Sequence, residues 1–112
     1  MRILGNVEER EAKMIKVLGC TNSLKDLIGK KISFVGAIVE NEKRTSKDGD
    51  EYVTNYVKVV EHDSGEISWR KFTQTVISDQ LIMLFENEIN DLEMELCYTE
   101  SNSGNKYLSI SI

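Results

Sequence analysis

The stretch that decides the fold is ISFVGAIV at residues 32–39, which is apolar on both of its alternating faces. A strand with one face in water alternates apolar and polar residues, so this pattern indicates a strand that is buried on both sides or shared by two sheets. Gly36, in its middle, indicates a bulge or a sharp bend. We therefore expect a bent first strand that contributes to both sides of the fold.

The chain beyond this stretch shows polar turns, alternating strands and one amphipathic segment. Asp48-Gly49 is a hairpin turn signal, and His62–Gly65 is a second turn. Leu81, Leu84 and Phe85 belong to an apolar helical face, for which Ser78 is the expected N-cap. The expected order is strand 32–39, strand 52–60, strand 67–77, helix 81–89, strand 92–99 and strand 107–112.

Three strands, one helix and two strands form the element order of an OB barrel, where the helix between strands 3 and 4 plugs one end. The bent first strand also fits that topology. We predict an all-β fold, β-rich with one helix: a five-stranded OB-type Greek-key barrel. A generic α+β domain with one antiparallel sheet remains the alternative.

The length of 112 residues predicts a single domain, which we place at residues 13–112. Residues 1–12 are polar and charged and are interpreted as a tail or a helical turn. KMIKVL at 13–18 is a short β-prone run, and Ser23 is expected to cap a brief helical piece at 24–28.

The net charge of −5 is unevenly distributed along the chain. Residues 78–112 carry seven acidic residues and one basic residue, so a basic face on the first two thirds stays compatible with the total. No apolar run is long enough to span a membrane, and the N-terminal residues lack the apolar core of a signal peptide. We expect a cytoplasmic protein.

Residues that could support catalysis form no constellation. His62 lies in a turn, and the cysteines Cys20 and Cys97 match no metal-ligand spacing and are expected to be reduced. Gly29-Lys30-Lys31 is similar to the end of a phosphate loop, but Leu24 stands where that motif requires glycine. We expect no enzymatic activity, no cofactor and no metal.

Trp69-Arg70-Lys71-Phe72 is the only place where aromatic and basic residues interleave. If Phe72 faces the core, Trp69 and Lys71 face solvent, because the opposite parity would bury an unpaired lysine. Arg70 is expected to reach the barrel rim. The same reasoning on the preceding strand places Tyr52, Tyr56 and Lys58 outside, next to Trp69 and Lys71.

Such a surface suits single-stranded DNA, because aromatic rings stack on any base and cations neutralise phosphates. The loops that flank the equivalent face of OB barrels add candidates here. The predicted nucleic-acid-binding residues are Tyr52, Tyr56, Lys58, Trp69, Arg70, Lys71, Lys43, Arg44, Lys47, Lys106 and Tyr107. Trp69 in the core, the tyrosines as cross-strand packing residues and residues 43–47 as a solvated hairpin are the alternatives.

Three stretches carry a family resemblance: KMIKVLGCTNSLKDLIGKKI (13–32), the Asp-Ser-Gly turn after the second strand, and LEMELCYTESNSGNKYLSISI (92–112). In these the chain resembles the short single-stranded DNA-binding proteins of Bacillus-type phages with protein-primed replication, and related OB-fold proteins of Gram-positive phages and mobile elements. The resemblance covers about residues 13–112. It implies coating of displaced strands during replication, with tyrosines stacking on bases; Tyr52 and Tyr56 lie in the matching strand.

Two departures from this family bear on function. The third strand, ISWRKFTQTVI, is more aromatic and basic than is usual there, and the chain ends within a strand in place of an acidic recruiting tail. The rival hypothesis is an acidic protein-binding module or inhibitor that mimics DNA through Glu86, Glu88, Asp91, Glu93, Glu95 and Glu100. The choice between DNA and RNA, homo-oligomerisation and binding to a replication protein stay open.

Overall fold

The computed structural model describes residues 2–40, 44–89 and 92–111. In chain order the elements are β1 (Arg2–Gly5), α1 (Glu9–Leu18), the 3-10 helix η1 (Leu24–Leu27), β2 (Lys31–Val39), β3 (Arg44–Thr45), β4 (Glu51–Tyr52), β5 (Asn55–Glu61), β6 (Ile67–Phe72), α2 (Thr75–Glu86), β7 (Met94–Glu100) and β8 (Lys106–Ser111).

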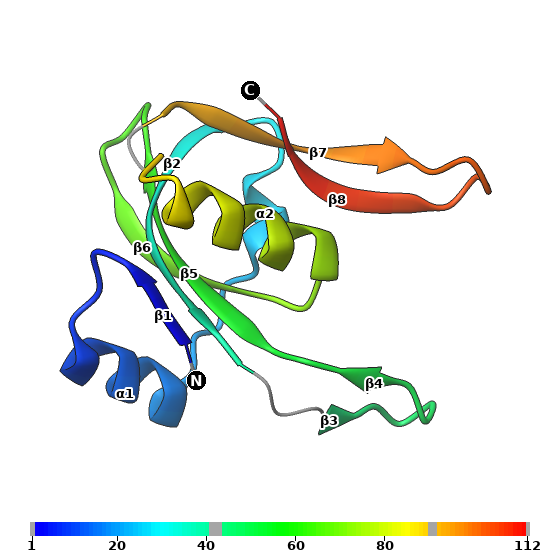
Figure 1. Cartoon of the computed structure of the whole chain (residues 1–112), viewed down its shortest axis with the longest axis horizontal. Helices are drawn as coiled ribbons and strands as arrows, with labels where there is room; N and C mark the ends of the chain where they lie inside the picture. Colours follow the sequence, from blue (N-terminus) through cyan, green and yellow to red (C-terminus); the bar gives the residue numbers. More distant parts are fainter. Residues whose placement is uncertain (1, 41–43, 90–91, 112) are drawn as a thin grey trace.

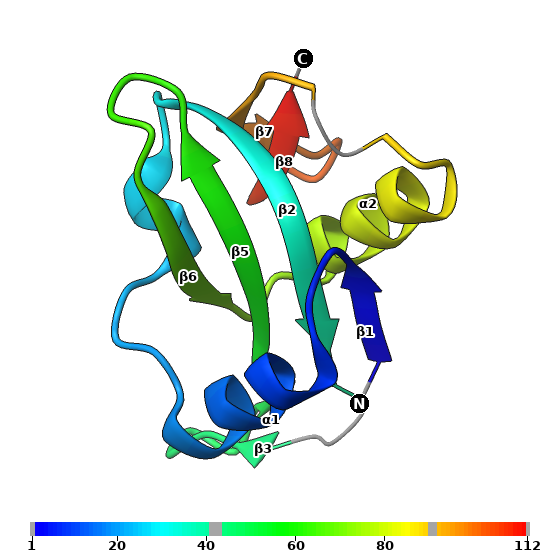
Figure 2. The ribbon, with the colours of Figure 1, turned by 90° about the vertical axis from the view of Figure 1, so that its left-hand side faces the viewer.

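The strand β2 is shared, as its apolar pattern predicts. Its start pairs with β7, its second half from Gly36 to Val39 pairs with β1, and β5 runs along its other edge (Figure 2). The register against β5 shifts between Phe34 and Gly36, which confirms the expected bulge. The result is a six-stranded antiparallel sheet in the order β6-β5-β2-β7-β8, with β1 beside β2.

The sheet is open, so the closure expected of a five-stranded barrel is not seen. In the described part of the chain no pairing joins β6 to β8. The free edge of β6 instead pairs with the segment after α1: the N–H of Lys71 donates to the carbonyl of Asn22 at 2.9 Å, and Ser23 forms a parallel bridge with Lys71. The β7–β8 hairpin extends away from β6 (Figure 1).

The N-terminal segment is structured, where a tail or helical turn was expected. Residues 2–5 form β1, and residues 13–18, which the sequence predicts to be a β-prone run, belong to α1. The acidic residues Glu9 and Glu11 in the first turn and the basic residue Lys16 in the last turn interact favourably with the helix dipole, which stabilises this helix. The fold is therefore β-rich with two α-helices, not one.

The helix α2 begins earlier than predicted. Thr75–Ile77, expected as strand, form its first turn, and Ser78, expected as its N-cap, lies inside it; the N-cap position is Gln74. Tertiary packing explains the difference, because Ile77 and Leu81 lie one helical turn apart and are both fully buried. Ser23 does occupy the N-cap position of η1, but its side chain makes no capping hydrogen bond.

The main core lies between the sheet and α2, with η1 contributing Leu24 and Leu27. Val57 and Val59 of β5 and Phe72 of β6 face this core, so the opposite faces of β5 and β6 point outward. Neither helix of the described chain has the length and apolar character of a membrane span.

Candidate nucleic-acid interface

Four predicted residues share the outer face of β5 and β6, because the strand register aligns them in two pairs. Tyr56 lies opposite Lys71, and Lys58 lies opposite Trp69. Phe72 is buried on the other face, as the parity argument requires. The structure thus brings these aromatic and cationic side chains together.

The helix α1 covers one half of this face, and the expectation that Trp69 stands free in solvent is wrong. The carboxylate oxygen Oε1 of Glu11 accepts hydrogen bonds from Lys58 Nζ at 2.8 Å and from Trp69 Nε1 at 3.1 Å. The hydrogen bond from Lys58 is the main reason that the pKa of Glu11 lies below its usual value; the indole contributes less. Lys58 and Trp69 therefore already have an anionic partner from the same chain.

The attachment of α1 to the body is slight. Ala12 is its only buried residue, and Lys16 Nζ lies 3.3 Å from the carboxylate of Glu40. Met14, Val17 and Leu18 remain exposed on the outer side of the helix. Polar contacts thus account for much of what holds α1 over Lys58 and Trp69.

Arg70 belongs to the opposite face and does not reach the rim. It lies opposite Val57 in the register, its side chain is largely buried, and its Nη2 is 4.0 Å from Glu61 Oε2. Lys30 Nζ contacts the other oxygen of the same carboxylate at 3.1 Å. The Glu61 carboxylate explains why Arg70 can lie on the buried face, since a buried cation requires a paired anion.

The uncovered half of the face continues into a groove of about 430 Å³, which we call the tyrosine groove. Its walls come from the segment after α1, from β4 and β5, and from the end of β6. The lining residues are Cys20, Ser23, Lys25, Tyr52, Thr54, Tyr56, Lys71, Phe72, Thr73 and Gln74.

The charge of the tyrosine groove is positive, in contrast to that of the whole chain. None of its described lining residues is an Asp or Glu, and neither Lys25 nor Lys71 has an ion-pair partner among the described residues. Burial raises the pKa of the Cys20 thiol, while Lys71 and Arg70 lower it in part. Lys71 is therefore close enough to act on a group in the groove.

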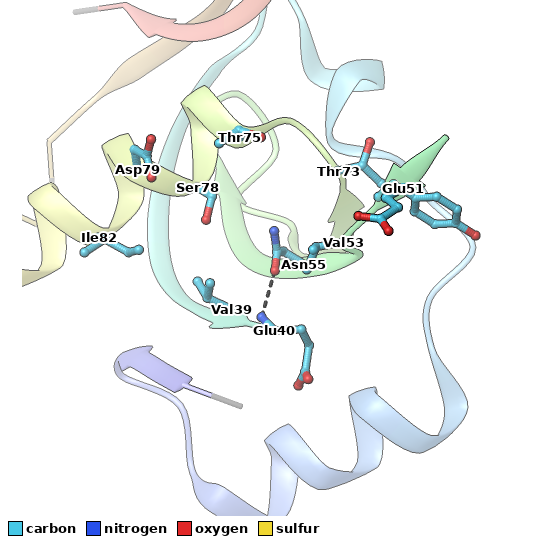
Figure 3. A pocket seen from close by; sticks show the side chains of 11 residues that line it. Val39, Glu40, Glu51, Val53, Asn55, Thr73, Thr75, Ser78, Asp79 and Ile82 are labelled. Atoms are coloured by element: carbon cyan, nitrogen blue, oxygen red, sulfur yellow. Dashed lines mark hydrogen bonds between the residues drawn. The ribbon is translucent and has the colours of Figure 1, made fainter. Parts of the chain in front are cut away.

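A second cavity, the asparagine pocket, adjoins the tyrosine groove, because Tyr52 and Thr73 line both spaces. Figure 3 shows the asparagine pocket from close by. The pocket has a volume of about 490 Å³ and lies between α2 and the start of β5. Its lining residues are Val39, Glu40, Glu51, Tyr52, Val53, Asn55, Thr73, Thr75, Ser78, Asp79 and Ile82.

The remaining predicted residues lie elsewhere or outside the described chain. Arg44 pairs with Tyr52 in the β3–β4 hairpin, Lys47 is exposed in its turn, and Lys43 lies outside the described residues. Lys106 and Tyr107 are on β8, in the hairpin that projects on the other side of α2 (Figure 1). The structure does not bring these two into the tyrosine groove.

Lys25 and the threonines of the groove are the residues that sequence reasoning missed. Lys25 lies in η1, and only the pairing of Ser23 with Lys71 carries it to the end of β6. That pairing is a parallel contact between segments far apart in the chain, and no local pattern signals it. Thr54 and Thr73 lie close to predicted site residues in the sequence, so the positions of those neighbours already indicate them.

The described residues show no arrangement of three or more His, Cys, Asp or Glu that could hold a metal ion. His62 is engaged at the surface, with Nε2 at 2.6 Å from Ser33 Oγ and Nδ1 at 3.6 Å from Glu93. In comparisons with known proteins, no family model, curated protein or solved structure matches this chain. The resemblance to phage single-stranded DNA-binding proteins therefore stays a prediction.

Proposed function

We propose that this protein binds single-stranded DNA in the tyrosine groove, with bases stacked on Tyr52 and Tyr56 and phosphates held by Lys25 and Lys71. One observation carries the proposal: a chain of net charge −5 keeps a groove with two tyrosines, two unpaired lysines and no lining carboxylate among its described residues. A polyanion with exposed π-faces is the ligand class that this combination suits.

The expected binding is of moderate strength and depends on salt. Each stacked base contributes about 1–3 kcal/mol, and two neutralised phosphates on a single strand give a slope of about −1.4 in log K against log salt concentration. Thr54, Thr73 and Gln74 supply neutral hydrogen-bonding groups along the same path. Nothing in this chemistry demands a particular sequence.

Extension of the strand onto Trp69 and Lys58 requires α1 to move, because the Glu11 carboxylate occupies the position that a phosphate would take. We infer that α1 competes with the strand for this half of the face. A longer strand that displaced Glu11 would gain one more ring and one more cation.

We also infer that the architecture is an OB-type fold that has not closed. The strand order β6-β5-β2-β7-β8 is that of an OB barrel with its third and fifth strands unpaired, and α2 lies between the third and fourth strands in the chain. Together with the family resemblance, this supports a role in coating displaced strands in phage or mobile-element replication, in the cytoplasm. RNA binding, self-association and contact with a replication protein are open extensions of the same role.

The test is a titration of fluorescently labelled oligo-dT at low salt, followed by anisotropy. Lys25→Ala and Lys71→Ala should each weaken binding and make its salt slope shallower by about 0.7. Lys13→Ala is the matched control, because Lys13 is an exposed lysine on α1, outside the groove. Absence of binding by the wild-type protein, or equal effects of all three variants, contradicts the proposal.

The rival function, protein binding, has one observation in its favour. Met14, Val17 and Leu18 are exposed at helical spacing and form an apolar stripe on α1. Of the acidic residues proposed for DNA mimicry, Glu86, Glu88, Glu93, Glu95 and Glu100 are exposed, and Asp91 lies outside the described residues. A wild-type protein that binds no strand at low salt favours this rival.

A further inference from the structure

The asparagine pocket contains a buried amide whose donor is unused. Asn55 is only 4% exposed, and its Oδ1 accepts the N–H of Glu40 at 2.8 Å. Its Nδ2 has no hydrogen-bond partner in the described chain and points toward α2, where the hydroxyl of Ser78 turns toward it (Figure 3). Ser78 is itself only 8% exposed, and its hydroxyl has no partner among the described residues.

Asn55 and Ser78 are largely buried, and their Nδ2 and hydroxyl open onto one cavity without a hydrogen-bond partner in the described chain, so both groups are available to a ligand. We propose that the asparagine pocket receives one base of the bound strand, and that this base is guanine. The inference rests on the proposed function and deepens it, since it adds a preference to a groove that by itself reads no sequence.

The position of the pocket favours a base of the strand in the tyrosine groove. Tyr52 and Thr73 line both spaces, so a strand that passes Tyr52 can place its next base in the pocket. Val39 and Ile82 provide apolar walls for a flat ring. Asp79, whose carboxylate has no ion-pair partner in the described chain, disfavours a phosphate and favours a ring edge with N–H donors.

Guanine matches the polar groups of the asparagine pocket better than the other bases do. Its carbonyl O6 can accept from Asn55 Nδ2 and from the Ser78 hydroxyl, and its adjacent N1–H and N2–H₂ can donate to a carboxylate. Asp79, the residue after Ser78 on α2, has no hydrogen-bond or ion-pair partner in the described chain and is the acceptor we assign.

The other bases lack part of this pattern. Adenine has no carbonyl, and its usual pairing with asparagine needs Oδ1, which here already accepts from Glu40. Thymine has a single N–H. Cytosine presents a ring acceptor beside its amino group, which a carboxylate repels.

The experiment compares the heptanucleotides d(TTTGTTT), d(TTTATTT) and dT7 on the full chain. We expect the guanine-containing strand to bind about tenfold more tightly than the adenine-containing strand. The side-chain amide resonance of Asn55 in a ¹H–¹⁵N spectrum should shift with the former and stay in place with the latter.

Two variants test the assigned donors. Asn55→Asp retains the acceptor for the Glu40 N–H but loses the donor, and Ser78→Ala removes the hydroxyl from a helical position. Each should reduce the guanine preference, measured within the same variant as the ratio of the affinities for d(TTTGTTT) and dT7. Asn102→Asp, in the exposed turn between β7 and β8, is the control for the added charge. If Asn55→Asp does not fold, Ser78→Ala and the wild-type spectrum still decide the question.

The possible failures are distinguishable. Equal affinities for the guanine and adenine strands, or an Asn55 amide that does not respond, overturn the pocket assignment while dT7 binding leaves the groove standing. If the wild-type protein binds none of the three strands, the proposed function and this inference fail together.

Discussion

Substitution of Glu11 by glutamine tests whether α1 competes with the strand. The change keeps an oxygen that can accept from Trp69 Nε1, but it removes the charge that pairs with Lys58 Nζ at 2.8 Å. Because Ala12 is the only buried residue of α1, this ion pair is a large share of what holds the helix in place.

The expected change in affinity follows from how exposed the Lys58–Glu11 ion pair is. A hydrogen bond to a charged group contributes about 1 kcal/mol more than a neutral one, and partial exposure reduces this toward the range of surface pairs. The side chains of Lys58 and Glu11 are 22% and 31% exposed, so we take about 1 kcal/mol as an upper value. If the strand must displace α1, Glu11→Gln should raise affinity for a long oligo-dT by up to about fivefold.

The assay is anisotropy of labelled oligo-dT at one fixed salt concentration, with Trp69 fluorescence recorded in parallel. Glu9→Gln is the matched control, because it removes the same charge from the same helix, and the only partner of Glu9 in the described chain is the exposed Lys13 at 3.6 Å. The ratio between the two variants isolates the contact with Lys58. Equal gains in Glu11→Gln and Glu9→Gln would show that α1 does not compete, and the reasoning above would be refuted.

Three further predictions follow from the same contacts. The lowered pKa of Glu11 means that its ion pair stabilises docked α1 above the usual value of 4.5 and loses this effect as the pH falls through the lowered pKa, so the Trp69 indole N–H resonance should move only below pH 4.5. Gly36→Ala should destabilise the fold by about 1–3 kcal/mol in urea denaturation, because a Cβ would meet Val7 Cγ2 and, at 2.8 Å, the carbonyl of Leu4. Leu81→Ala should cost about 2–5 kcal/mol in the same measurement, since Leu81 is a fully buried residue of α2.

Much of the candidate site follows from strand parity. Alternation in β5 and β6 correctly places Tyr56, Lys58, Trp69 and Lys71 on one face, because successive side chains of a strand point to opposite sides. The error on Trp69 arises from α1, whose local run of apolar residues fits a strand as well as a helix. The prediction that Arg70 reaches the rim is wrong because strand parity alone does not reveal its buried partner Glu61.

The sequence by itself determines the elements around β2: the apolar stretch, the bend at Gly36 and the alternation of the last two strands are local patterns that report local burial. Only the tertiary structure decides which long-range contacts form. The edge of β6 pairs with residues 22–23, which leaves the sheet open and carries Lys25 into the tyrosine groove. Glu11 reaches Lys58 and Trp69 across a separation of 47 and 58 residues, and a contact between such distant positions leaves no periodicity in the chain.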